Sequence, residues 1–117
     1  LTLITTASLL REVETADTGL VMPKEVWSGP ADAAPARLFT ADLAWDKETT
    51  HTDDLDSFFP IHRLQELVEA GRIGGLAPRF HGAPTEYSQR RTIEQDAPEI
   101  LRRCREDEAD AALLVPL

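Results

Sequence analysis

The sequence predicts one α/β domain, residues 1–117, with a mainly parallel sheet flanked by helices in three layers. Three observations predict this class. Short apolar runs suited to buried strands alternate with stretches of helical period. Segments rich in proline and glycine separate these runs. A length of 117 residues allows a single domain with its own core.

The first predicted element is a strand at Leu1–Thr5, an apolar and β-branched run typical of a strand buried on both faces. The residues that follow, from Thr6 to Ser8, would form the loop at the carboxyl end of that strand. The same residues allow an alternative, because Ser8 could cap a short helix. That helix would direct three apolar side chains inward: Leu9, Leu10 and Val13.

The next stretch, Val21–Ala36, contains prolines and glycine and keeps no period, so it is interpreted as a long surface excursion. Met22 and Trp27 would anchor it to the core. Apolar and polar residues then alternate over Arg37–Trp45, which predicts a second strand. The acidic stretch Asp46–Ser57 has no period and is predicted to be a loop.

A helix is predicted after Pro60, a residue that fits the first helical position. Its apolar stripe comprises Ile61, Leu64, Leu67 and Val68. Gly71 follows the last periodic residue and suits a left-handed helix end. The short run Ile73–Ala77 predicts a third strand that Pro78 would terminate.

The last two elements are a helix and a strand. After an irregular stretch, Phe80–Thr92, a helix is predicted to begin near Asp96 with Pro98 in its first turn. The apolar run Ala111–Val115 predicts the final strand. The inward stripe of the helix would comprise Ala97, Ile100, Leu101 and Cys104.

The central stretch of the chain also resembles a known family. Residues 58–79 read FFPIHRLQELVEAGRIGGLAPR, similar to a run FPIDRLRELVEEGEIGSLAPRHYSFMG of the selenoprotein B family. This family comprises the catalytic subunits of glycine, sarcosine, betaine and D-proline reductases. The opening LTLITTASL resembles the family's first strand and its Thr-Thr-Ala-Gly turn. Residues 51–53, 97–100 and 109–116 resemble, in order, a His-Ser/Thr-Asp element and the last helix and strand.

The resemblance implies a fold similar to one half of an aspartate/glutamate racemase. It implies reductive cleavage of a small amino-acid-like substrate by selenolate or thiolate attack. In the family, the reactive selenocysteine or cysteine follows the run that residues 109–116 resemble, so it would come after Leu117. We therefore hypothesise that the chain is the N-terminal part of a selenoprotein, ended at an unrecoded selenocysteine codon and inactive by itself. The alternative is a domain that naturally ends at this point.

The expected substrate site gathers loop residues at the carboxyl edge of the sheet. Arg79 could hold a substrate carboxylate with two hydrogen bonds, or it could simply pair with an acidic side chain. Residues 78–88, PRFHGAPTEYS, depart from the family's PRHYSFMG run, so the substrate itself is not carried over. The predicted substrate-binding residues are Thr6, Ser8, His51, Arg79 and His81, with Asp53 beside them.

Two further groups of residues could carry chemistry. Cys104, the single cysteine, lies on the apolar stripe of the last helix and is interpreted as a buried small hydrophobe without catalytic function. His51 and the acidic residues Asp53, Asp54 and Asp56 could ligate a divalent metal, but their spacing matches no metal motif. We therefore predict no metal and no cofactor in this chain, and an exposed position for His62.

Composition limits the partners. Twelve basic against twenty-one acidic residues give a net charge of −9, which argues against nucleic acid and anionic membranes as partners. One cysteine fits a reducing compartment, and we predict a cytoplasmic location. An uncovered last strand would favour a homo-oligomer. The resemblance to the reductase family implies, in addition, association with subunits of a reductase complex. The alternative function is a non-catalytic α/β module that binds a partner.

Overall fold

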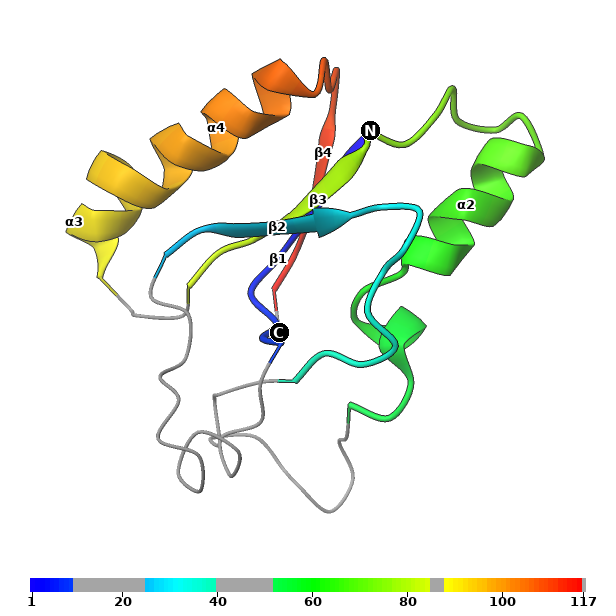
Figure 1. Ribbon diagram of the computed structural model, residues 1–117, viewed down its shortest axis with the longest axis horizontal. Helices are drawn as coiled ribbons and strands as arrows, with labels where there is room; N and C mark the ends of the chain where they lie inside the picture. Colours follow the sequence, from blue (N-terminus) through cyan, green and yellow to red (C-terminus); the bar gives the residue numbers. More distant parts are fainter. Residues whose placement is uncertain (10–24, 40–51, 85–87, 117) are drawn as a thin grey trace.

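A computed structural model describes residues 1–9, 25–39, 52–84 and 88–116, and their central element is a four-stranded sheet (Figure 1). The strands lie in the order β2-β3-β1-β4. β1 pairs in parallel with both β3 and β4, and β2 pairs antiparallel to β3. An α/β fold with a mostly parallel sheet is therefore confirmed. The strand bounds are Thr2–Thr5 for β1, Trp27–Pro30 for β2, Arg79–Gly82 for β3 and Ala112–Val115 for β4.

Two helical segments lie on either side of this sheet (Figure 1). The first comprises a 3-10 turn, η1, at Leu55–Ser57 and the helix α2 at Ile61–Glu69. The second comprises α3 at Gln89–Arg91, a π-helical turn η2 at Thr92–Asp96 and α4 at Ala97–Glu106.

The core lies between α2 and one face of the sheet. Phe80 of β3 is 1% exposed and packs edge-on against Phe59, with ring centroids 4.9 Å apart. Leu3 of β1 and Ile61 and Leu64 of α2 belong to the same cluster. Each fully buried side chain of this size stabilises the fold by about 1.5–3 kcal/mol. Neighbouring strand residues point to opposite faces, so the residue after Phe80 faces α4.

The strand β2 corrects the interpretation of Val21–Ala36 as a surface excursion only. The sequence WSGP has low strand propensity, but it lies at the sheet edge, where proline is tolerated. Side-chain packing stabilises this strand, because the Trp27 ring lies over Gly82 and the Phe80 ring lies over Gly29. A Cβ atom at these glycines would lie 1.9 Å from the Trp27 ring and 2.5 Å from the Phe80 ring. The expectation that Trp27 anchors this stretch to the core is confirmed.

The predicted strand at Ile73–Ala77 is also wrong, because the third strand begins after Pro78 instead of ending there. Two glycines in Ile73–Ala77 provide no side chain to pack. The segment instead holds the start of the chain, since the Ala77 N–H donates to the Leu1 carbonyl at 2.7 Å. Phe80 supplies the buried aromatic side chain that makes Arg79–Gly82 the strand.

The helix after Pro60 is confirmed, with a different start. Pro60 is the N-cap residue rather than the first helical one. The Asp56 carboxylate caps the helix instead, accepting hydrogen bonds from the backbone N–H of His62 at 3.0 Å and of Arg63 at 3.4 Å. Gly71 has a φ of +65°, as its position after the helix predicts.

The last helical segment begins earlier than the sequence predicts, at Gln89 instead of near Asp96. Ser88 caps it, because its hydroxyl oxygen accepts a hydrogen bond from the Arg91 N–H at 3.3 Å. Pro98 lies in the first turn of α4, as expected. Of the predicted inward stripe, Cys104 is 9% exposed but Leu101 is 50% exposed.

Of the predicted strand at Arg37–Trp45, residues 40–45 lie outside the described residues, as does most of the alternative helix after Ser8. Leu38 is fully buried in the core, and Phe39 forms an antiparallel bridge with Ser8. The final strand at Ala111–Val115 is confirmed as β4, although Leu114 is 68% exposed.

Candidate functional site: a buried polar network beside an apolar groove

A network of polar side chains connects the sheet to the C-terminal end of α4, with His81 at its centre. His81 of β3 lies beside Ser28 of β2 in the strand register and has no exposed surface. Its Nδ1 atom lies 2.8 Å from the Ser28 hydroxyl oxygen. Its Nε2 atom has no hydrogen-bond partner within the described part of the chain and lies 3.7 Å from an Asp107 carboxylate oxygen.

Two arginines complete the network. Arg79 Nε donates to both carboxylate oxygens of Asp107, at 3.0 and 2.9 Å. Its Nη2 donates to Glu106 at 3.3 Å. Arg103 of α4 donates from Nη1 to the Ser28 hydroxyl at 2.8 Å and from Nε to Glu99 at 2.7 Å. These bonds fix α4 to β2 and β3 on the face of the sheet opposite α2.

The electrostatics of the network keep His81 neutral. Burial lowers the pKa of His81 below its ordinary value. The negative charge of Asp107 opposes this effect, and the positive charges of Arg79 and Arg103 lower the pKa further. Hydrogen bonds to Asp107 raise the pKa of Arg79. Hydrogen bonds from Arg102 and Arg103 lower the pKa of the partly exposed Glu99 to about 2. At neutral pH the imidazole at the centre of the network is thus uncharged.

This arrangement suits stabilisation better than catalysis. The Ser28, His81 and Asp107 side chains have the residue types of a nucleophilic triad. However, Asp107 is beyond hydrogen-bond distance of His81, and a fully buried imidazole has no contact with a substrate. Ser28 also accepts a hydrogen bond from Arg103, which does not increase the nucleophilicity of its oxygen. The network therefore holds two strands and a helix together.

The predicted substrate residues do not converge at one edge of the sheet. Arg79 and His81 were expected in a loop at the carboxyl end of a strand, and this placement is wrong. Arg79 begins β3, at the amino end, where the Thr2 hydroxyl donates to its carbonyl oxygen at 2.9 Å. His81 lies inside β3, beside Ile4. The sequence predicts that the third strand ends at Ala77, but β3 begins two positions later, at Arg79. Arg79 therefore lies at the amino end of the strand and not at its carboxyl end.

Thr6 and Ser8 follow β1 at its carboxyl end, as the sequence predicts. Ser8 is 6% exposed, and its backbone exchanges hydrogen bonds with that of Phe39 at 2.6 and 2.8 Å. Thr6 lines the groove between α4 and the sheet. His51 lies outside the described residues, so its predicted place beside these two remains a prediction.

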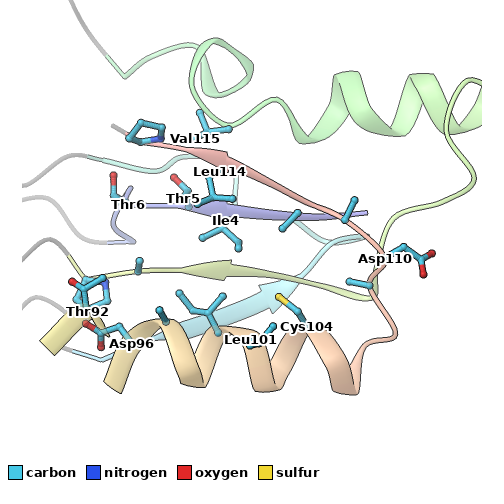
Figure 2. A pocket seen from close by; sticks show the side chains of 18 residues that line it. Ile4, Thr5, Thr6, Thr92, Asp96, Leu101, Cys104, Asp110, Leu114 and Val115 are labelled. Atoms are coloured by element: carbon cyan, nitrogen blue, oxygen red, sulfur yellow. The ribbon is translucent and has the colours of Figure 1, made fainter. Parts of the chain in front are cut away.

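The groove lies between α4 and the β1–β4 half of the sheet and has a volume of about 640 Å³ (Figure 2). Its lining is mostly apolar, with Ile4, Leu101 and Leu114 on its walls. The Cys104 sulfur points toward it. Burial raises the pKa of the Cys104 thiol, with Asp107 adding to the effect, so the thiol is protonated and weakly nucleophilic at neutral pH. This agrees with the expected non-catalytic role of Cys104.

Two acidic side chains of the loop before α2, Asp56 and Asp53, pair with basic side chains. Asp56 accepts a hydrogen bond from His62 Nδ1 at 2.7 Å, besides capping the helix. Asp53 forms a close ion pair with Arg37. His62 is exposed, as predicted. No group of three or more potential metal ligands occurs among the described residues, which exclude His51.

Sequence reasoning did not identify Ser28, Arg103 or Asp107 as members of a site. Ser28 lies in a stretch without period, and Asp107 follows the last helical turn among several acidic residues. Only the pairing of β2 with β3 and the position of α4 bring them to His81.

Comparisons of the chain with models of protein families, with curated proteins and with solved structures find no match. None of the described helices combines the length and the apolar character required to cross a membrane.

Proposed function

We propose that the chain is the N-terminal part of a selenoprotein B-like reductase, which cleaves a small amino-acid-like substrate by selenolate or thiolate attack. In this proposal the sheet and its helices form one three-layer half of a fold similar to that of aspartate/glutamate racemases. The chain alone would be inactive, and the reactive selenocysteine or cysteine would follow Leu117 in the full-length protein. The resemblance of residues 58–79 and 109–116 to the family supports this proposal.

The register of β1 with β4 is the observation that carries it. Val115 lies directly opposite Thr5 in two parallel strands, so both strands reach the same edge of the sheet together. Thr6 and Pro116, the next residues of each strand, both line the groove. A reactive residue following β4 would therefore emerge beside the loop after β1. Ligands of open α/β sheets bind in such crevices, outside the carboxyl ends of adjacent strands.

The protonated Cys104 thiol, the single thiol of the chain, supports the second part of the proposal, that the chain alone lacks the thiolate that the reaction requires. Arg79 has no place in the proposed crevice because it pairs with Asp107 at the other end of the strands. The substrate contacts would come from Thr6 and from residues outside the described part of the chain, His51 among them.

An activity measurement tests the proposal. The 117-residue chain and the longer protein, read through the codon after Leu117, are assayed with a dithiol reductant and glycine, sarcosine, betaine and D-proline. We expect turnover of at least one substrate by the longer protein only. Turnover by the short chain, or an ordinary stop codon without a following open frame, would overturn the proposal.

A second candidate is a non-catalytic module that binds a partner, and the exposed apolar lining of the groove favours it. Leu101 and Leu114 are 50% and 68% exposed, an unusual position for leucines that face each other across a groove. The stop-codon result above would leave this candidate as the better one.

A further inference from the structure

The outer edge of β4 is a surface without a partner among the described residues. β4 ends the strand order, and no described strand pairs with its outer side. Within the described part of the chain, the outward-facing N–H and C=O groups of β4 therefore have no strand partner, and such a row of groups is the template for strand addition. Natural edge strands are usually protected by charges or proline, but β4 reads Ala-Leu-Leu-Val, with Pro116 directly after it.

The apolar groove lies directly beneath this edge. Leu114 of β4 and Ile4 of β1 form one wall, and Leu101 of α4 forms the other. Side chains of a strand added to β4 would point alternately to the two faces of the sheet. Those on the α4 side would enter the groove, which has room for large apolar side chains at about 640 Å³.

The charge of the groove lining indicates the chemistry of the partner. Of the described residues that line it, Asp96 and Asp110 are charged, and none is a lysine or arginine. Asp96 lies near Arg91, with Nε of the arginine 3.7 Å from the carboxylate. Asp110 is exposed, and the described residues provide it with no ion pair. Figure 2 shows Asp96 and Asp110 at opposite ends of the groove with apolar side chains between them, and the Asp110 carboxylate is directed outward at the rim.

We propose that β4 and the groove bind an extended apolar peptide segment of another protein, added to the sheet as a further strand with a basic side chain beside Asp110. Main-chain hydrogen bonds along β4 provide affinity, the groove selects apolar side chains, and Asp110 selects a cation. A second copy of this chain fits less well, because each copy carries a net charge of −9 and a carboxylate at the same place. The proposal rests on the second candidate function, the partner-binding module, and a peptide-binding measurement on the 117-residue chain tests it separately from the turnover assay.

The test uses a fluorescent peptide of alternating leucine and threonine that ends in lysine, measured by fluorescence anisotropy. One control peptide ends in glutamate, and another has a central proline, which cannot complete a strand ladder. We expect saturable binding of the lysine peptide, weaker binding of the glutamate peptide and none of the proline peptide. Binding should weaken at higher salt.

Variants locate the site. Leu114→Glu should weaken binding at least about tenfold, and Asp110→Asn about threefold with a smaller salt dependence. Leu114 is 68% exposed, so its replacement should leave the circular dichroism spectrum unchanged, and Leu114→Thr provides a milder second variant. Leu67→Glu, on α2 at 37% exposure, is the matched control and should bind normally.

Three results would overturn the proposal. They are no binding at millimolar peptide, binding that Leu114→Glu leaves unchanged, and a dimer that Leu114→Glu dissociates and the peptide does not displace. The last result would identify a second copy of the chain as the occupant of β4.

Discussion

At the scale of single residues, Arg79 and His81 have structural roles that their sequence context does not reveal. Arg79 holds a carboxylate with two hydrogen bonds, as expected of its guanidinium, but the carboxylate is that of Asp107. The Asp107 side chain is 8% exposed and depends on Arg79 for its charge compensation. His81 is neutral and fully buried between Ser28 and Asp107. Both residues thus contribute to stability in measurable ways.

Replacing Arg79 should destabilise the fold. Arg79→Ala leaves a buried carboxylate without its partner, which we expect to cost about 2 kcal/mol of the free energy of unfolding. Urea denaturation measures this change, and Asp107→Asn in the same chain should recover part of it. Arg63→Ala removes an exposed pair with Glu66 and should change stability by less than about 0.5 kcal/mol. Equal effects of the two substitutions would contradict the role of Arg79.

His81 should make stability depend on pH. Its pKa is lowered in the folded state, so the unfolded chain binds the proton more tightly and acid favours unfolding. The free energy of unfolding should be highest above the ordinary histidine pKa of about 6.5 and fall as pH decreases toward 5. His81→Gln should flatten this slope. At pH 8, the difference in the free energy of unfolding between the unsubstituted protein and His81→Gln measures the packing lost by the substitution. If His81→Gln leaves the pH dependence of stability unchanged, His81 is not the group responsible for it.

At the scale of elements, the sequence predicts the parts that local patterns determine. The helix after Pro60, its end at Gly71 and the strands at both ends of the chain follow from period and capping signals. The strand β2 and the start of β3 do not, because rings packed over Gly29 and Gly82 select them against their local propensity. An error of a few residues in β3 was sufficient to place Arg79 at the wrong end of the predicted site.

The close contact at Gly82 makes a direct prediction. Gly82→Ala places a methyl group 1.9 Å from the Trp27 ring, so the ring or β2 must move. Overpacking of this kind should cost about 1–3 kcal/mol, measured by thermal or urea unfolding. Gly74→Ala is the matched control, since no atom lies within 4 Å of its added Cβ. A Gly82→Ala protein as stable as the control would mean that β2 does not pack as described.

The cap of α2 gives a second prediction at this scale. Asp56→Ala removes the carboxylate that accepts from the His62 and Arg63 N–H groups, and should lower the free energy of unfolding by about 1 kcal/mol. The exposed Asp32, replaced by alanine, should have an effect within about 0.5 kcal/mol. Similar losses at both positions would exclude a specific cap.

At the scale of the whole molecule, the two faces of the sheet differ. One face packs on α2 and forms the core, whereas α4 and its polar network cover only the β2–β3 half of the other face. The remaining half, formed by β1 and β4, lines the groove. Thr6 and Pro116 follow these two strands at their carboxyl ends and also line it. The proposed reductase and the proposed peptide partner both depend on this uncovered half.

The residue that follows Leu117 in the native protein tests the reductase proposal most directly. Mass spectrometry of the protein isolated from its source would identify the peptide that contains Ala112–Val115 and what comes after it. We predict a peptide that continues past Leu117 with selenocysteine or cysteine as its next residue. A native chain that ends at Leu117, or one that continues with any other residue, would contradict the account.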